Sequence, residues 1–288
     1  MLIAGPTASG KSALAIAKAR EMGGVVVNTD AMQVYGVLRV VTARPAPGEM
    51  HGVPHLLYGT VDPSLRYSTG DWLRAVEAII AEDGDRPLIF AGGTGLYFDA
   101  LTKGLAEIPE VPAAFVRDAE AELRGLDRAG RERLIAERDP ETARRLQAAD
   151  PQRVARALAV LKATGRPLAS FQGAATAGLL GDFAVERIVL SPPREVLRDR
   201  IARRFEAMLE GGAVEEVRAL LSLDLDPGLP AMKAIGVPEI GDWLAGQASR
   251  EEVVERAVTA TRQYAKRQRT WFRNRMADWT WIETVQGA

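Results

Sequence analysis

The first residues of the chain have the types and the spacing needed to hold a phosphate group. Gly5 is followed, after four residues, by Gly10-Lys11-Ser12, which is the spacing of a P-loop. In such a loop backbone N–H groups converge on phosphate oxygens, the lysine adds a positive charge and the hydroxyl coordinates a magnesium ion. The predicted phosphate-binding residues are Gly5, Thr7, Ala8, Ser9, Gly10, Lys11 and Ser12, with Ser12 as the ligand of Mg²⁺.

A carboxylate is predicted at the same edge of the sheet as this loop. Residues 2–4 read as a strand, residues 13–22 as a helix and residues 25–28 as a second buried strand, so the segment forms a βαβ unit. Ligands of open parallel sheets lie beyond the carboxyl ends of the strands. Asp30 follows the second strand and is therefore a candidate site residue, although an Asx turn or a helix cap would also explain an aspartate there.

The third predicted strand, residues 88–91, is followed by Gly92-Gly93-Thr94-Gly95. A nucleotide hydrolase would commonly have an acidic residue here for its magnesium shell. The glycines would let a ligand approach the backbone closely, and Thr94 offers a neutral hydroxyl. A tight turn from strand to helix accounts for the glycines equally well, so both interpretations remain open.

Residues 250–275 are predicted to form a helix with a basic stripe. Seven basic residues and no acidic ones lie between Arg256 and Arg275. Such a stripe, interleaved with Tyr264, Gln268 and Trp271, suits a phosphodiester backbone and stacking on an unpaired base. A solvated face is the usual alternative for a run of charges, but without carboxylate partners this one would repel itself.

Composition excludes several other classes of protein. The 288 residues are 47% apolar and 26% charged, which is ordinary for a globular protein. The chain has no cysteine, so a disulfide scaffold and a thiolate metal site are excluded. A metal pair at His51 and His55 is rejected because Gly52 and Pro54 argue against a helix there. No signal segment is evident and no apolar run approaches the roughly 20 residues that span a bilayer, so we expect a cytoplasmic protein without membrane contact.

The order of strands and helices predicts an α/β fold with a P-loop NTPase-like core, in which helices flank a mostly parallel sheet. Charged, alanine-rich helical segments between residues 113 and 175 predict an inserted all-helical subdomain. The predicted domains are therefore a catalytic core of residues 1–112 and 176–288 and an insertion of residues 113–175. In the core, a long helix after Pro193 carries Arg200 and Arg204, which either reach the phosphate loop or belong to a solvated flank.

These motifs, taken together, resemble the tRNA dimethylallyltransferase (IPP transferase) family. The matching segments follow one another through nearly the whole chain. They are residues 5–12, 30–35, 42–45, Tyr67-Ser68 with Asp71, residues 92–97, residues 150–153 with Arg156, Arg204-Phe205, residues 261–268 and residues 270–273. The sequence departs from the family at Ala31, where serine is usual, and at Val41, where glycine is usual.

The resemblance implies a reaction. A dimethylallyl group would pass from dimethylallyl diphosphate to N6 of the adenosine immediately 3′ of the anticodon in tRNA, and diphosphate would be released without a need for ATP. Lys11, the loop amides, Ser12 through magnesium and the catalytic Arg204 would stabilise the leaving group. Asp30 would accept the proton of the amine, and Thr94 would hold the amine or the adenine edge.

The resemblance also implies how the RNA is held. The target base should be flipped out of its stack into a channel, while the basic helix and the insertion grip the anticodon stem-loop. A monomer is the simpler expectation for an enzyme that admits so large a partner. The predicted tRNA-binding residues are Asp30, Ala31, Met32, Gln33, Gln152, Arg153, Arg156, Arg262, Lys266, Arg267, Arg269 and Arg273.

Two other functions compete with this hypothesis. A P-loop kinase for a small molecule or nucleoside would use the phosphate loop but would leave the basic helix without a task. A non-catalytic RNA-binding protein that uses a nucleotide as a conformational ligand would bind RNA but form no covalent product.

Overall fold

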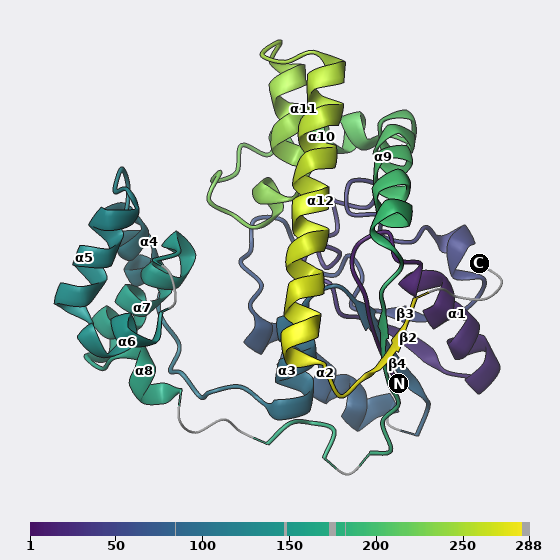
Figure 1. Ribbon diagram of the computed structural model, residues 1–288, viewed down its shortest axis with the longest axis horizontal. Helices are drawn as coiled ribbons and strands as arrows, with labels where there is room; N and C mark the ends of the chain where they lie inside the picture. The colour runs from purple at the N-terminus through teal and green to yellow at the C-terminus, as the bar shows by residue number, and fades with distance from the viewer. Residues whose placement is uncertain (84, 147–148, 173–176, 182, 284–288) are drawn as a thin grey trace. The chain divides into compact units, whose positions relative to one another are not determined.

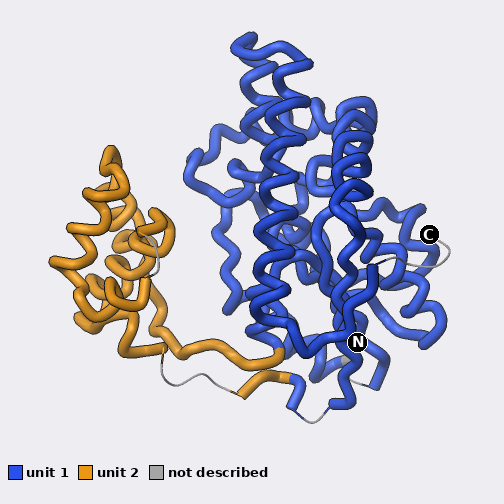
Figure 2. The backbone as a smooth tube through the Cα atoms, viewed as in Figure 1, with its two compact units in different colours: residues 1–101, 180–288 blue, residues 102–179 orange. Residues whose placement is uncertain are grey.

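The chain divides into two compact units. The computed structural model describes residues 1–83, 85–146, 149–172, 177–181 and 183–283. One unit consists of Met1–Leu101 with Leu180–Ala288, and the other of Thr102–Leu179 (Figure 2). No helix in the described part of the chain is both long and apolar enough to cross a membrane.

The first unit is built on one six-stranded sheet (Figure 1). Its strands are β1 (Leu2–Ala4), β2 (Val25–Asn28), β3 (His55–Leu56), β4 (Leu88–Gly92), β5 (Arg187–Leu190) and β6 (Thr280–Ile282). They are arranged in the order β3-β2-β4-β1-β5-β6, and every pairing is parallel. The strands that come next in the chain, β2, β3 and β4, lie on one side of β1, and the later strands β5 and β6 lie on its other side. The carboxyl end of β1 is therefore the point where the strand order reverses, which is where open parallel sheets bind ligands.

Seven α-helices lie wholly or mainly in the described part of this unit. They are α1 (Lys11–Met22), α2 (Thr69–Asp83), α3 (Gly95–Lys103), α9 (Arg194–Glu210), α10 (Ala213–Leu221), α11 (Val237–Leu244) and α12 (Arg250–Arg275). α12 begins with a capping box in which Ser249 and Glu252 each accept the other's backbone N–H. It packs along α9, with Ile201, Phe205 and Ala257 in a shared core (Figure 1).

The regular elements of the second unit are all helices among its described residues. Its helices are α4 (Ala113–Glu122), α5 (Arg128–Arg138), α6 (Pro140–Arg145), α7 (Pro151–Thr164) and α8 (Leu168–Phe171). Aspartates at positions 127, 139 and 150 cap α5, α6 and α7 by accepting a backbone N–H from the first turn. α7 supplies much of the core of this unit through Val154 and Leu158.

The fold class predicted from the sequence is confirmed: the core is α/β with a parallel sheet flanked by helices. Some elements differ in extent. The end of the sequence also reads as a closing edge strand at residues 279–285; the observed strand covers Thr280–Ile282, and residues 284 and 285 lie outside the described residues. The helix after the phosphate loop begins at Lys11 instead of residue 13, and α11 was not predicted. Pro238 lies in the first turn of α11, where its missing N–H costs no hydrogen bond.

The glycines after β4 are explained by the approach of α12. A Cβ atom on Gly93 would lie 2.2 Å from Nε2 of Gln268, and one on Gly95 would lie 2.1 Å from the indole of Trp271. Both partner side chains come from α12, more than 170 residues later in the chain. These two glycines are therefore required because another part of the protein fills the space beside them.

We predict that Gly95→Ala destabilises the first unit. The added methyl group must displace the half-buried Trp271, which should lower the free energy of unfolding by about 1–3 kcal/mol. Urea denaturation followed by tryptophan fluorescence reports this unit, because all five tryptophans lie in it. Gly48→Ala is the matched control, since its Cβ would meet no atom within 4 Å. An unchanged urea midpoint for Gly95→Ala would contradict this explanation of the glycine.

Candidate active site

The phosphate loop connects the carboxyl end of β1 to α1 through a strained backbone. Ala8 and Gly10 have positive φ angles of 63° and 91°, which turn successive N–H groups toward one side. Gly5 permits close packing, since a Cβ there would lie 2.6 Å from Oγ of Ser9. The first amides of α1 have no acceptor within the helix, and the helix dipole places a partial positive charge at this end. The loop is therefore shaped to bind an anion.

Two cations and one carboxylate meet at this loop. Desolvation lowers the pKa of Lys11 to about 8; the charge of Asp30 opposes this shift and the charge of Arg204 adds to it. Burial likewise lowers the pKa of Arg204, and Asp30 again acts in the opposite direction. Asp30 thus interacts electrostatically with both cations. The side chains come from α1, α9 and the segment after β2, so the structure brings together three residues that the sequence predicted for one site.

Arg204 is also tied to the loop by direct contact. Its Nη2 atom donates a hydrogen bond to Oγ1 of Thr7. Arg200, one turn earlier on α9, has its Nη1 atom 3.8 Å from the position of a Cβ on Gly10. Both arginines considered in the sequence analysis therefore lie beside the phosphate loop.

Local hydrogen bonds hold Asp30 in place. Its backbone N–H donates to Oδ1 of Asn28 at 2.9 Å, and its own Oδ1 accepts from the N–H of Met32 at 3.0 Å. The Asx turn considered as an alternative is therefore present. It occupies Oδ1, whereas Oδ2 lies 3.4 Å from the position of a Cβ on Gly93. The turn orients the carboxylate and is compatible with a chemical role for the second oxygen.

Thr94 lies in the same hydrogen-bonded group. Its Oγ1 atom accepts from the N–H of Ala31 at 2.9 Å, and its own N–H donates to the carbonyl of Thr29 at 3.1 Å. Burial, and after it the charge of Asp30, raise the pKa of Tyr264, and the charge of Arg267 and the side chains of Thr94 and Gln268 offset only part of this rise. The Tyr264 hydroxyl therefore belongs to this site, close to both Asp30 and Thr94. From the sequence, this tyrosine was predicted only as a possible RNA contact. It lies four residues before Gln268, so the two side chains share one face of α12.

Gln268 joins α12 to the phosphate loop. Its Oε1 accepts from the N–H of Thr7 at 2.9 Å, and its Nε2 donates to the carbonyl of Gly93 at 2.9 Å. The side chain is buried, with only 5% of its surface exposed. Gln268 is therefore not free to contact RNA, because its amide bonds internally at both atoms. From the sequence, Gln268 was placed on the exposed basic face of the helix because Arg267 and Arg269 flank it, whereas the structure places it on the buried face. Trp271 is half-buried, with its indole Nε1 against Gly95, and its contact with RNA stays a prediction.

The predicted tRNA-binding residues lie in three places. Four of those on α12 are exposed, and Arg269 is partly buried. In the segment after β2, the side-chain amide of Gln33 bonds within the protein: its Nε2 donates to the carbonyls of Thr42 and Ala43 at 2.9 and 3.0 Å. The third group belongs to the second unit, where Gln152, Arg153 and Arg156 are exposed near the start of α7. Their contacts with RNA stay a prediction.

The side chains at this site would bind Mg²⁺ only together with phosphate oxygens of the substrate. Within the described ranges there is no group of three or more His, Cys, Asp or Glu side chains that could hold a metal. Ser12 is exposed in the first turn of α1. Mg²⁺ commonly keeps several waters and binds through a few protein oxygens together with substrate phosphates. The residues present therefore fit an ion that binds together with a diphosphate, with Ser12 as its protein ligand.

Comparison with known proteins identifies the family. The sequence pattern of IPP transferase matches residues 33–275, and that of isopentenyl transferase matches residues 1–60. The chain belongs to the IPP transferase family. It is similar to the tRNA dimethylallyltransferase of Rhizobium meliloti (strain 1021), with 53% identity over 98% of this chain and 93% of that protein. The protein of the same description from Agrobacterium fabrum is 51% identical, over 98% of this chain and 96% of the relative.

Solved structures agree with this family assignment. The tRNA isopentenylpyrophosphate transferase of Bacillus halodurans has a TM-score of 0.68 and 32% identity, covering 98% of this chain and 88% of that one. A eukaryotic dimethylallyltransferase acting on tRNA has a TM-score of 0.79 and 26% identity, covering 99% of this chain and 73% of that one. The family and the enzyme class predicted from the sequence are confirmed, and the kinase alternative is not favoured.

We predict that the phosphate loop loses affinity for an anionic substrate as pH rises through about 8. Lys11 carries its charge below this pKa and loses it above, so attraction for a diphosphate weakens on the alkaline side. A profile of kcat/KM for the diphosphate substrate should bend downward near pH 8. Lys11→Arg is the control, because a guanidinium stays charged across this range and should remove the bend even if the overall rate falls. A wild-type profile that is flat to pH 10 would count against a depressed Lys11.

Proposed function

We propose that this enzyme transfers a dimethylallyl group from dimethylallyl diphosphate to N6 of the adenosine immediately 3′ of the anticodon in tRNA, releasing diphosphate. The observation that carries the proposal is the electrostatic interaction of Asp30 with both Lys11 and Arg204 at the phosphate loop. This arrangement sets a proton acceptor beside a binding site for a leaving anion. The similarity to bacterial tRNA dimethylallyltransferases supports transfer of a dimethylallyl group to tRNA.

Departure of diphosphate is assisted by the cations of the loop. As the bond between the allylic carbon and the diphosphate oxygen breaks, negative charge grows on the leaving oxygen. Lys11, Arg204 and the first amides of α1 stabilise that charge without reorganising, because the fold already holds them together. Ser12 would hold Mg²⁺ together with the substrate, and the ion would supply further neutralisation of the diphosphate.

Asp30 completes the transfer on the acceptor side. The N6 amine of adenine is a poor nucleophile because its lone pair is delocalised into the ring. As its nitrogen bonds to the allylic carbon, the amine loses one proton, and Oδ2 of Asp30 accepts it. Thr94, whose Oγ1 accepts the Ala31 N–H beside Asp30, would hold the amine or the adenine edge.

The exposed cations provide the surface for the RNA. Arg262, Lys266, Arg267 and Arg273 on α12 and the exposed group on α7 of the second unit would contact the phosphates of the anticodon stem-loop. A base must leave its stack to reach Asp30, so flipping of the target adenosine is part of the proposal. A monomeric state and a cytoplasmic location remain predictions from the sequence.

We predict that Asp30→Asn loses most of the transfer rate while retaining affinity for tRNA. The amide cannot accept the proton, and general-base catalysis contributes roughly 10²–10⁴-fold. The experiment incubates the enzyme with unmodified tRNA, dimethylallyl diphosphate and Mg²⁺, and detects the prenylated adenosine by mass spectrometry of the nucleosides. Filter binding measures tRNA affinity in the same samples.

Asp62→Asn is the matched control, because Asp62 is an exposed carboxylate that bonds only Ser64 among the described residues. It should leave both the rate and the affinity unchanged. Wild-type turnover in Asp30→Asn would refute the assigned base. Absence of any prenylated product with the wild-type enzyme would refute the proposed reaction itself.

A further inference from the structure

Glu216 of α10 accepts three hydrogen bonds from one stretch of backbone. Its Oε1 atom accepts the N–H groups of Arg39 at 2.7 Å and Val40 at 2.9 Å, and its Oε2 atom accepts that of Val41 at 2.9 Å. Successive backbone N–H groups that converge in this way form a small anion-binding concavity, and hydrogen bonds to a carboxylate are stronger than those between neutral groups. The carboxylate therefore holds the turn of residues 38–44 against α10.

The backbone of this turn is strained. Ala43, whose N–H donates to the carbonyl of Val40 at 2.9 Å, has a φ angle of 53°. This left-handed conformation is unfavourable for a residue with a Cβ atom, and it persists only where the surrounding contacts fix it. Glu216 supplies three of those contacts.

The side chain of Val41 gives the turn a second anchor. It is buried in a core that also contains Val217 of α10 and Phe205 of α9. α10 itself packs on α9 and α11 (Figure 1). Because Val41 would keep the turn near these helices, removal of the Glu216 carboxylate should loosen the turn without unfolding the unit.

Carbonyl groups of the same turn hold a side chain that is predicted to bind tRNA. Nε2 of Gln33 donates to the carbonyls of Thr42 and Ala43 at 2.9 and 3.0 Å, and these bonds use both protons of its amide. The main chain at Gln33 has an anchor of its own, because its carbonyl accepts the N–H of Gly59 at 2.9 Å. The turn therefore connects Glu216 to the amide of Gln33, while the backbone around Asp30 is held separately.

We propose that Glu216 is a positioning residue for the use of tRNA, a role that rests on the proposed function. It acts through the turn of residues 38–44, which fixes the amide of Gln33. The phosphate loop is held by other side chains, those of Gln268 and Arg204. Loss of the Glu216 carboxylate should therefore impair the use of tRNA and leave the use of the diphosphate substrate unchanged.

The test compares Glu216→Gln with Glu215→Gln. Each variant removes one negative charge from the same part of α10, but Glu215 is exposed and pairs with Arg218 on its own helix at 3.9 Å. Removal of negative charge by itself would strengthen attraction for RNA, so a weaker interaction in Glu216→Gln cannot result from charge. Glutamine cannot accept all three N–H groups, because its amide nitrogen is a donor.

We expect Glu216→Gln to raise the KM for tRNA by about five- to tenfold, with kcat and the KM for dimethylallyl diphosphate close to those of the wild type. Glu215→Gln should leave all three values close to those of the wild type. A smaller fraction of folded enzyme would lower kcat and change neither KM, so this comparison separates positioning from destabilisation. An unchanged KM for tRNA, or an equal rise in both KM values, would overturn the proposal.

Hydrogen exchange tests the structural step without the reaction. The amides of residues 39–41 should exchange at least about tenfold faster in Glu216→Gln than in the wild type, whereas β1 and the phosphate loop should exchange alike in both. Equal exchange at residues 39–41 would contradict the anchoring role of Glu216. If the wild-type enzyme forms no prenylated product, the proposed function fails. Filter binding of an unmodified tRNA anticodon stem-loop then replaces KM, and equal affinities of the wild type and Glu216→Gln would overturn this proposal as well.

Discussion

The site depends on one electrostatic arrangement: a carboxylate held beside two cations in a desolvated loop. Burial alone disfavours the charges of Lys11 and Arg204, and the carboxylate of Asp30 offsets part of that cost. A diphosphate would bring more negative charge to the same cations and leave Asp30 free to act as a base. Without substrate, the carboxylate of Asp30 therefore balances part of the charge of Lys11 and Arg204, and the charge of a bound diphosphate would take over that role.

This arrangement requires the two ends of the chain to meet. Gln268 accepts the N–H of Thr7 and donates to the carbonyl of Gly93, so one side chain of α12 links the phosphate loop to the turn after β4. The absence of side chains at Gly93 and Gly95 allows the helix to come this close. Because the same helix exposes basic residues on its other side, the surface that we propose for RNA and the geometry of the phosphate loop depend on one helix.

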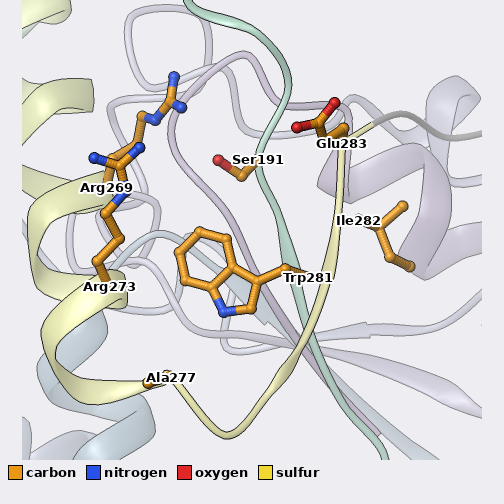
Figure 3. A pocket seen from close by; sticks show the side chains of 7 residues that line it. All are labelled: Ser191, Arg269, Arg273, Ala277, Trp281, Ile282 and Glu283. Atoms are coloured by element: carbon orange, nitrogen blue, oxygen red, sulfur yellow. The ribbon is translucent and has the colours of Figure 1, made fainter.

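Much of this site could be predicted from the sequence, because its parts follow local rules. The spacing of Gly5 and Gly10-Lys11-Ser12 predicts the loop, and strand ends in a parallel sheet predict that Asp30 and Thr94 lie nearby. The α/β fold follows from alternating strands and helices. The internal role of Gln268 could not be predicted, because it depends on contacts with residues 261 and 175 positions away. The pocket lined by Ser191 and Trp281 (Figure 3) could not be predicted for the same reason, since these residues come together only in the folded chain.

The most direct test of the central interaction is the pKa of Lys11 itself. Nitrogen NMR of selectively labelled lysine can follow its titration in the wild-type enzyme and in Asp30→Asn, without substrate. Because the Asp30 charge favours the protonated ammonium, the pKa should fall further below about 8 when that charge is removed. An unchanged Lys11 pKa in the variant would mean that the carboxylate and the phosphate loop do not interact, and it would contradict the account of the site.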